Sequence, residues 1–272
     1  MDKLIKPSVV RSLLSHYDLR ADKGFGQNFL VDERALQDIV SAAELNSEDS
    51  VLEVGPGLGV LTRELAARAG RVTSVELDER LLAVLNETLQ GLDNVTVVHE
   101  DGLEYDLTQI PQDSLLVANL PYNVATPLIV RALRSTRFKR LVFLVQREVA
   151  ERLCAIPGSK AYGSLSLIVR HFADARRVRD VKPSAFFPPP EVTSSVVRLD
   201  VKPDAADTPE LFEFIRTGFR HRRKTLRKNL QMAGFAATEV VTAMAELGLN
   251  SKIRAEALDL DTFDQLRRKL RR

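Results

Sequence analysis

The sequence predicts an α/β protein with a mostly parallel sheet covered on both faces, followed by a small all-helical C-terminal region. Two observations support this fold class. Between residues 51 and 145, short runs rich in apolar and β-branched residues alternate with longer amphipathic stretches, which is the pattern of strand–helix–strand units. After residue 204, only amphipathic helical patterns follow.

Each element has its own local signal. Pro7 occupies the tolerated first-turn position of a helix expected over residues 7–16. Asp32 is the expected N-cap of a helix from residue 33 to about residue 43. Short apolar runs then predict strands at 51–54, 72–75, 95–98, 115–118 and 141–145. The stretches between them predict helices at 60–69, 79–89, 125–134 and 147–154. Two further strands, expected as an antiparallel ending, are predicted at 177–181 and 192–201. Four last helices are predicted at 210–219, 223–233, 238–247 and 262–270.

A polar, proline-bracketed linker at residues 202–209 divides the chain. We expect residues 1–204 to form one domain with an N-terminal helical extension, and residues 205–272 to form a second, helical one. Residues 208–272 contain fourteen Lys/Arg and eight Asp/Glu, against 25 and 29 in residues 1–207. A basic C-terminal region after a mildly acidic N-terminal region is typical of nucleic-acid binding, although solvent-exposed helix faces can have the same composition.

Composition excludes several classes of protein. Hydrophobic and charged contents of 44% and 28% are those of a soluble globular protein. We find no apolar stretch long enough for a signal peptide or a membrane span. The single cysteine, Cys154, excludes an internal disulfide framework, and the four histidines lack metal-ligand spacing. We therefore expect a cytoplasmic protein that has no metal ion and does not contact a membrane.

The segment Gly55-Pro56-Gly57-Leu58-Gly59 lies between a predicted strand and a helix, which is a nucleotide-binding arrangement. Its spacing departs from the dinucleotide fingerprint, in which the third glycine would fall at Val60. No Lys-Ser/Thr pair of a phosphate-binding loop follows. The loop therefore favours a single nucleoside without phosphate, such as S-adenosyl-L-methionine, with Gly55 and Gly57 as contacts.

Two acidic residues lie in register with this loop. Glu76 ends the second predicted strand, where a carboxylate accepts hydrogen bonds from both ribose hydroxyls. Asp101 follows the third strand, where it accepts a hydrogen bond from the adenine amine of the cofactor. Either residue alone is more commonly a strand-end or helix-cap residue, so the prediction depends on their combination with the glycine loop.

The motif Asn119-Leu120-Pro121-Tyr122 follows the fourth predicted strand. We expect the side-chain oxygen of Asn119 and the carbonyl of Leu120 to accept hydrogen bonds from both N–H groups of an adenine amine, which frees the nitrogen lone pair. Pro121 fixes the turn without a competing N–H, and Tyr122 offers a ring for stacking. Alone the motif is commonly an ordinary turn, but together with the glycine loop it predicts methyl transfer to adenine.

These motifs resemble those of the ribosomal RNA adenine dimethyltransferases, specifically the KsgA type that acts on small-subunit rRNA. The resemblance runs from Lys23 to the C-terminal end. It implies a Rossmann-like class I S-adenosylmethionine methyltransferase sheet with a small all-helical C-terminal domain. Residues 25–30 match the N-terminal cofactor motif, which implies that Asn28 and Leu30 line the methionine end of the cofactor. The family's remaining cofactor positions match Gly55, Glu76, Asp101 and Asn119.

Two later segments share the resemblance. Residues 185–194 match the family's proline-rich motif, which implies that Phe186 stacks on the target base opposite Tyr122. Residues 219–226 resemble its basic C-terminal helix, which contacts rRNA. The implied RNA contacts are Arg220, Arg222, Arg223 and Lys224.

The resemblance also implies a reaction and a partner. The reaction is dimethylation of two adjacent adenosines in the 3′-terminal hairpin loop of 16S rRNA, within the small ribosomal subunit or its precursor, and we expect a monomer. Macrolide-resistance methylases of large-subunit rRNA share the catalytic motifs and remain an alternative. A DNA adenine methylase is less favoured, because no extra target-reading region is evident. A ribosome-assembly factor that acts mainly by binding is a third alternative.

Overall fold

The computed structural model describes residues 4–22, 26–121 and 124–270. The chain divides into two compact units. The first consists of Met1–Ala150 and Ala173–Asp204, and the second of Glu151–Phe172 and Ala205–Arg272. The division after Asp204 lies within the linker predicted from the sequence. Residues 151–172 belong to the second unit, whereas the division expected from the sequence placed them in the first domain.

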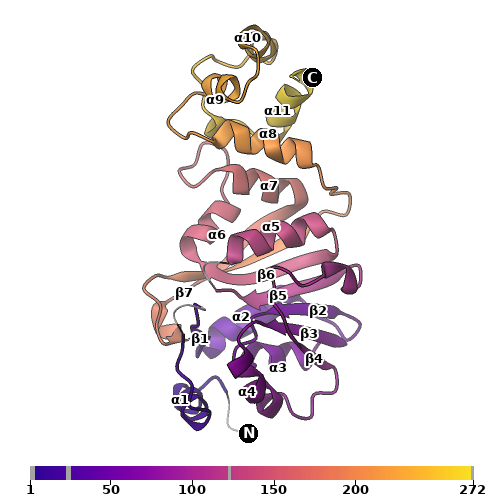
Figure 1. Ribbon diagram of the computed structural model, residues 1–272, viewed down its shortest axis with the longest axis vertical. Helices are drawn as coiled ribbons and strands as arrows, with labels where there is room; N and C mark the ends of the chain where they lie inside the picture. The colour runs from indigo at the N-terminus through magenta and orange to yellow at the C-terminus, as the bar shows by residue number, and fades with distance from the viewer. Residues whose placement is uncertain (1–3, 23–25, 122–123, 271–272) are drawn as a thin grey trace. The chain divides into compact units, whose positions relative to one another are not determined.

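A seven-stranded sheet forms the centre of the first unit (Figure 1). Its strands, in spatial order, are β4 (Val95–His99), β3 (Arg71–Glu76), β2 (Ser50–Val54), β5 (Ser114–Asn119), β6 (Phe138–Gln146), β9 (Ser194–Val201) and β7 (Ala173–Val181). The first five pair in parallel, and β9 pairs antiparallel with both β6 and β7. The predicted parallel sheet with an antiparallel ending is confirmed.

The strand order reverses at β2, which pairs with β3 on one side and β5 on the other. In open α/β sheets, ligands bind at the carboxyl ends of the strands beside such a reversal, because the two crossover connections leave in opposite directions and open a crevice. The residues that follow β2 and β5 are Gly55 and Leu120. Both predicted ligand motifs therefore flank this crevice.

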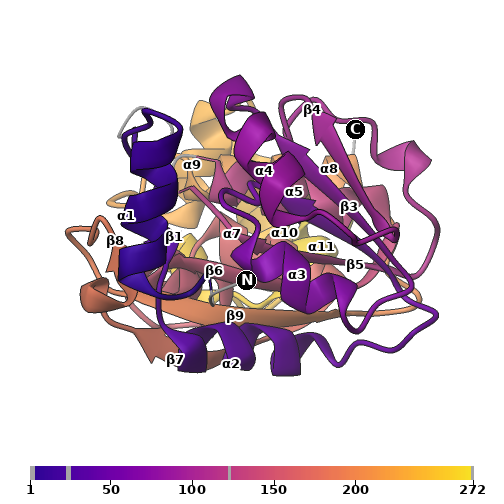
Figure 2. The same cartoon turned by 90° about the horizontal axis from the view of Figure 1, so that it is seen from below.

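Helices cover both faces of the sheet. The helices of this unit are α1 (Pro7–His16), α2 (Glu33–Ala43), α3 (Val60–Ala66), α4 (Leu82–Thr88), α5 (Ala125–Ser135) and the start of α6 (Arg147–Leu153). Helix α2 runs along β6, β9 and β7 (Figure 2) and begins at the predicted cap, where Asp32 accepts from the backbone N–H of Ala35 at 2.8 Å. It shares a core with Val142 and Leu144 of β6. The alternate residues Leu141 and Phe143 are also buried, so β6 is covered on its second face too.

The N-terminal segment packs against the ligand crevice. Val10 and Leu14 of α1 share a core with Phe29, Leu58 and residues of the α4 region. Phe29 and Leu30 form the short strand β1 (Phe29–Leu30), which pairs antiparallel with β8 (Phe186–Phe187). The register places Leu30 opposite Phe186. Two motifs that lie far apart in the sequence are therefore neighbours in the structure.

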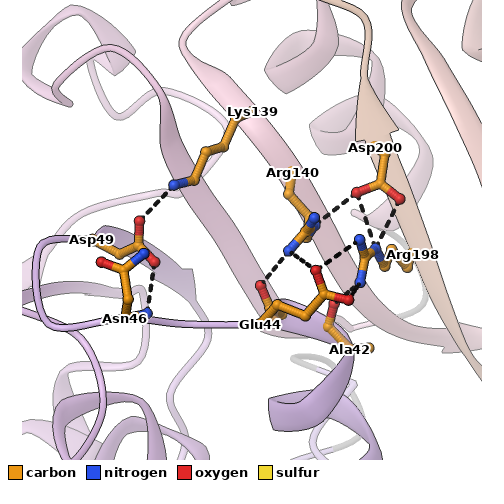
Figure 3. Close-up of polar contacts among 9 residues, drawn as sticks. Ala42, Glu44, Asn46, Asp49, Lys139, Arg140, Arg198 and Asp200 are labelled. Carbon is orange, nitrogen blue, oxygen red and sulfur yellow. Dashed lines mark hydrogen bonds and ion pairs between the residues drawn. The ribbon is translucent and has the colours of Figure 1, made fainter.

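An ion-pair network lies near the amino-terminal end of β6, at the end of the sheet opposite the carboxyl ends of the parallel strands. Figure 3 shows its side chains. Arg198 of β9 is almost buried and binds both carboxylate oxygens of Asp200, at 3.0 and 2.8 Å. Arg140 of β6 binds Asp200 at 2.7 Å, and both arginines also pair with Glu44. Each arginine donates to a carbonyl in the last turn of α2, at 2.9 and 3.0 Å. The network satisfies carbonyls that a helix C-terminus leaves without partners, and it fixes α2 to the sheet.

The second unit is helical and has an aromatic core. Its helices are the end of α6, α7 (Ser164–Phe172), α8 (Pro209–Phe219), α9 (Leu226–Met232), α10 (Ala237–Glu246) and α11 (Leu260–Lys269). Phe263 stacks on Phe219 with ring centroids 5.8 Å apart and meets Phe214 edge to face at 6.3 Å. Tyr162 is fully buried, and its hydroxyl donates to the Leu258 carbonyl at 2.9 Å. No helix in the described ranges has the length and apolar character needed to cross a membrane.

Several sequence-predicted boundaries are wrong. The helix expected over residues 79–89 is a short 3-10 turn (Glu79–Leu81) followed by α4. The helix expected from residue 223 begins at Leu226, because Thr225 caps it by accepting from the backbone N–H of Lys228 at 3.3 Å. Strand β7 begins four residues earlier than predicted, at Ala173, and α7, β1 and β8 were not predicted.

Candidate active site

A cavity of about 280 Å³ lies at the carboxyl ends of the parallel strands. It lies wholly within the first unit. The structure brings together in its wall nine of the residues predicted for the site: Asn28, Leu30, Gly55, Gly57, Glu76, Asp101, Asn119, Leu120 and Phe186. Tyr122 lies outside the described residues.

The glycine loop depends on backbone conformations that glycine adopts without strain. Gly55, Gly57 and Gly59 have φ values of +73°, +59° and +82°, in the region that L-residues with a Cβ avoid. A Cβ on Gly59 would lie 2.9 Å from Leu89 and 3.0 Å from Thr88. The third glycine is therefore required both by the turn and by the close packing of α3 against α4.

The carboxylate of Glu76 is bonded to this loop through the backbone N–H of Gly57. It is only 6% exposed, and burial raises its pKa, while hydrogen bonds from the backbone N–H groups of Asp78 and Gly57 act in the opposite direction. The two donors lie 2.9 and 3.3 Å from its two oxygens. Each oxygen retains further acceptor capacity toward the cavity, as a ribose diol requires.

Asp101 also lines the cavity, in the turn after β4. Its Oδ1 accepts from the backbone N–H of Leu103 at 2.8 Å, which fixes the carboxylate in an Asx-type turn. Among the described residues, nothing donates to its Oδ2. The second oxygen is therefore available to a ligand amine.

Asn119 lies at the end of β5 with its side chain in the cavity wall. Its Nδ2 donates to the backbone carbonyl of Asn28 at 3.2 Å. No described residue donates to its Oδ1. Leu120 follows, with its N–H bound to the Leu144 carbonyl at 3.1 Å. The side-chain oxygen of Asn119 is thus free to accept a hydrogen bond, as its predicted role requires.

Of the three remaining predicted contacts, Leu30 and Phe186 lie in the β1–β8 pair, and Asn28 directly precedes β1. Leu30 and Phe186 are opposite each other, buried to 5% and 4% exposure, and share the core of α2. Phe186 also lines the cavity. Asn28 is held by a hydrogen bond from its Nδ2 to the Gly26 carbonyl at 3.0 Å.

Sequence reasoning missed Glu53 as a site residue. Glu53 lines the cavity and is 1% exposed, and its Oε2 accepts from the hydroxyls of Thr62 (2.7 Å) and Ser74 (2.8 Å). Burial raises the pKa of Glu53 to about 7, although both hydroxyls act in the opposite direction. The available signal was a charged residue inside the otherwise apolar run Val51–Val54. Together with Glu76 and Asp101, Glu53 makes the cavity acidic, which suits a cationic ligand.

The predicted RNA contacts lie in the second unit, in the turn between α8 and α9. Arg220, Arg222, Arg223 and Lys224 are all exposed. The expected basic helix is therefore a basic turn. Asn229 of α9 fixes it by donating to the carbonyls of Gly218 (2.7 Å) and His221 (3.3 Å).

The fold and the cavity define a class of protein: a methyltransferase that uses S-adenosyl-L-methionine. The family model of ribosomal RNA adenine dimethylases matches residues 19–269. The chain therefore belongs to the ribosomal RNA adenine dimethylase family.

Individual relatives agree with this assignment. Over 262 residues, the chain is 45% identical to ribosomal RNA small subunit methyltransferase A of Deinococcus radiodurans, covering 94% of this chain and 88% of the relative. The protein of the same name from Clostridium botulinum strain Kyoto is 40% identical, covering 94% and 96%.

Two solved structures share the fold over most of their length. A dimethyladenosine transferase from Plasmodium falciparum has a TM-score of 0.77 and 29% identity, covering 88% of this chain and 95% of that one. The 23S rRNA methyltransferase ErmE has a TM-score of 0.71 and 27% identity, covering 89% and 99%.

The packing of Gly59 is tested by comparing it with Gly91, which has almost the same φ (+81°) but open space around its Cβ position. Gly91→Ala should lower the free energy of unfolding by about 1–2 kcal/mol through backbone strain alone. Gly59→Ala should lower it by about 1–3 kcal/mol more, because it also overpacks α3 against α4. Denaturant titration of both variants measures the difference, and equal losses would contradict the packing argument.

The buried Glu53 carboxyl predicts a pH dependence of stability. Its pKa is about 7 in the folded protein and about 4.5 in the unfolded chain. Its stabilising contribution is therefore complete below pH 4.5 and is lost as the pH rises through 7. We expect the unfolding free energy of the wild type, relative to Glu53→Gln, to fall by about 3 kcal/mol across this range. Glu104→Gln, at an exposed position, is the control, and a flat difference for Glu53→Gln would refute the prediction.

Proposed function

We propose that this protein dimethylates two adjacent adenosines in the 3′-terminal hairpin loop of small-subunit rRNA. The observation that carries the proposal is the position of Asn119, whose free oxygen lines the same cavity as Glu76, Asp101 and the glycine loop. The relatives named as small subunit methyltransferases support the choice of subunit. We further propose that the protein acts on the ribosomal subunit or its precursor as a cytoplasmic monomer.

The residues present fit S-adenosyl-L-methionine. Glu76 would hold the ribose hydroxyls, Asp101 the adenine amine, and Gly55 and Gly57 the chain between the nucleoside and the methionine end, which Asn28 and Leu30 would line. The acidic wall made by Glu53, Glu76 and Asp101 suits a ligand with a positive sulfonium. When bound, the cofactor supplies an electrophilic methyl group on a sulfur that leaves as a neutral thioether.

The protein's own contribution to the chemistry is to hold the target amine. The Asn119 oxygen and the Leu120 carbonyl would accept its two N–H groups, which favours a pyramidal nitrogen with an available lone pair. Phe186, and Tyr122 on the opposite face, would stack on the base. The amine loses its proton only after the new bond forms, so orientation contributes more than a general base. A base must leave its stack to enter the cavity, which favours a loop as the target.

We assign RNA binding to the second unit. Arg220, Arg222, Arg223 and Lys224 lie exposed in one turn, and arginine and lysine side chains neutralise phosphates without reading sequence. Arg222 also donates to the Lys160 carbonyl at 3.2 Å, which gives this turn a second fixed point within the unit.

A second candidate is methylation of large-subunit rRNA, because the fold of ErmE is also similar. Its 27% identity is lower than the 45% and 40% of the small-subunit relatives. Mass spectrometry of both rRNAs after incubation with the protein and isotopically labelled cofactor distinguishes the two. We expect two methyl groups on each of two adjacent adenosines in the small-subunit rRNA. Methylation of the large-subunit rRNA alone would overturn the proposal.

Asn119→Ala should abolish methylation and leave binding to the small ribosomal subunit nearly unchanged, because the phosphate contacts are assigned to other residues. Asn86→Ala, which removes an exposed amide on α4, is the matched control and should be fully active. Labelled-methyl incorporation and subunit co-sedimentation measure the two properties. Loss of subunit binding in a folded Asn119→Ala protein would argue against this division of roles, and favour a factor that acts mainly by binding.

Replacing Arg222, Arg223 and Lys224 by alanine should weaken RNA binding and reduce the slope of log affinity against log salt by about 2–3. The control is the same change of charge at Arg267, Arg268 and Lys269, which are already paired with Asp264 and Glu246 and should affect the slope less. Cofactor affinity should not change in either variant. An unaltered salt slope in the first variant would remove the turn from the RNA interface.

A further inference from the structure

Two consecutive residues of the N-terminal segment connect both sides of the cavity. The side chain of Gln27 donates through Nε2 to Oδ2 of Asp78 at 2.7 Å. The backbone carbonyl of Asn28 accepts from Nδ2 of Asn119 at 3.2 Å. Gln27 and Asn28, here called the Gln27–Asn28 bridge, both line the cavity.

On one side, the bridge is bonded to Asp78, which in turn positions Glu76, the carboxylate proposed to hold the ribose. Asp78 is 4% exposed and its backbone N–H donates to Oε1 of Glu76 at 2.9 Å. Arg80 binds both oxygens of Asp78, at 2.8 and 2.7 Å, and holds the pKa of Asp78 below its usual value. Gln27 therefore bonds to an ionised carboxylate, and such charge-assisted bonds are stronger than neutral ones.

The side chain of Gln27 acts on the protein and not directly on a ligand. Its Nε2 bonds to Asp78, and its Oε1 accepts from the backbone N–H of Asp22 at 2.9 Å. Both polar atoms of this amide thus have protein partners. Its position next to Asn28 in the sequence then fixes where the Asn28 carbonyl lies.

On the other side, the bridge orients the amide of Asn119. A backbone carbonyl can only accept a hydrogen bond, so the group of Asn119 that faces Asn28 must be its NH₂. The oxygen is thereby turned away from Asn28. Without this contact, rotation about the last side-chain bond is only weakly restricted, and a flipped amide would present a donor to the target N–H group.

We propose that Gln27 is a positioning residue that links the ribose-holding loop at Asp78 to the orientation of the Asn119 amide, through the carbonyl of Asn28. The inference rests on the roles proposed above for Glu76 and Asn119. Its consequence is specific: loss of the Gln27–Asp78 bond lowers turnover even when the cofactor site is saturated, because Asn119 loses its fixed orientation.

The test uses the full chain with small ribosomal subunits that lack the modification. For Gln27→Ala, we expect kcat at saturating cofactor to fall about 10- to 100-fold, the range for loss of a hydrogen bond to a charged group. The KM for the subunit should stay within about twofold of the wild type, because the proposed phosphate contacts are intact. Gln37→Ala is the matched control, since this exposed glutamine also faces a carboxylate, Glu64, at 3.5 Å, and it should be fully active.

A second variant separates positioning from a general loss of structure. In Gln27→Glu, an ionised carboxylate would face Asp78, whereas its protonated form has an O–H that restores the donor. The ratio of its kcat to that of the wild type should therefore rise as the pH falls. The charged groups around position 27 that act on this titration are Asp78, Arg80 and Asp22. A merely structural role would raise this ratio only in step with the folded fraction, which circular dichroism at each pH measures.

The outcomes separate this inference from the proposed function. If Asn119→Ala retains full methylation, the assignment of the site fails. If Asn119→Ala is inactive while Gln27→Ala turns over at the wild-type rate, only the positioning role is refuted. A pH-independent activity ratio for Gln27→Glu would also refute the positioning role. This second test remains valid even if Gln27→Ala does not fold.

Discussion

The parallel hydrogen-bond ladder that joins β3, β2 and β5 is the constraint on which the site depends. Because parallel strands share one direction, their carboxyl ends lie at the same end of the sheet, and Glu76, Gly55 and Asn119 all lie there. The reversal of strand order at β2 opens the crevice between them. The ion-pair network of Arg140 on β6 and Arg198 on β9 holds the other end of the sheet against α2 (Figure 3), so fold anchoring and ligand binding use opposite ends of the same sheet and different strands.

Acidic groups in a partly buried cavity are costly unless they have donors or a cationic ligand. The structure supplies donors from inside the protein: hydroxyl groups for Glu53, backbone N–H groups for Glu76, and an Asx-type turn for Asp101. The raised pKa values of Glu53 and Glu76 show that these donors compensate burial only in part. A ligand with a positive sulfonium would complete the compensation, which is a physical reason for the match between this cavity and its cofactor.

The parts of the fold that sequence reasoning predicted are those with local causes. An apolar strand, a glycine loop that needs positive φ, and an N-cap such as Asp32 each follow from a few adjacent residues. The errors have local or tertiary causes. By residue propensity, the basic segment near residue 223 is predicted to be helical. In the structure, Thr225 caps α9 after this segment, and the side chain of Asn229 stabilises the preceding turn by a hydrogen bond to an earlier carbonyl. Strands β1 and β8 have two residues each, too short for any periodicity.

By itself the sequence determined the chemistry available at each strand end: the glycine loop, Glu76, Asp101 and the Asn119 motif, because these residue types follow strands in a regular alternation. It also determined the family, through motifs along nearly the whole chain. Only the tertiary structure decided what those groups face. Burial gave Glu53 its raised pKa, and the pairing of Leu30 with Phe186 brought two distant motifs together. The contact of Asn119 with Asn28 turned the amide oxygen away from the N-terminal segment. Hydrogen-bond direction and burial depend on distant parts of the chain, so no local pattern encodes them.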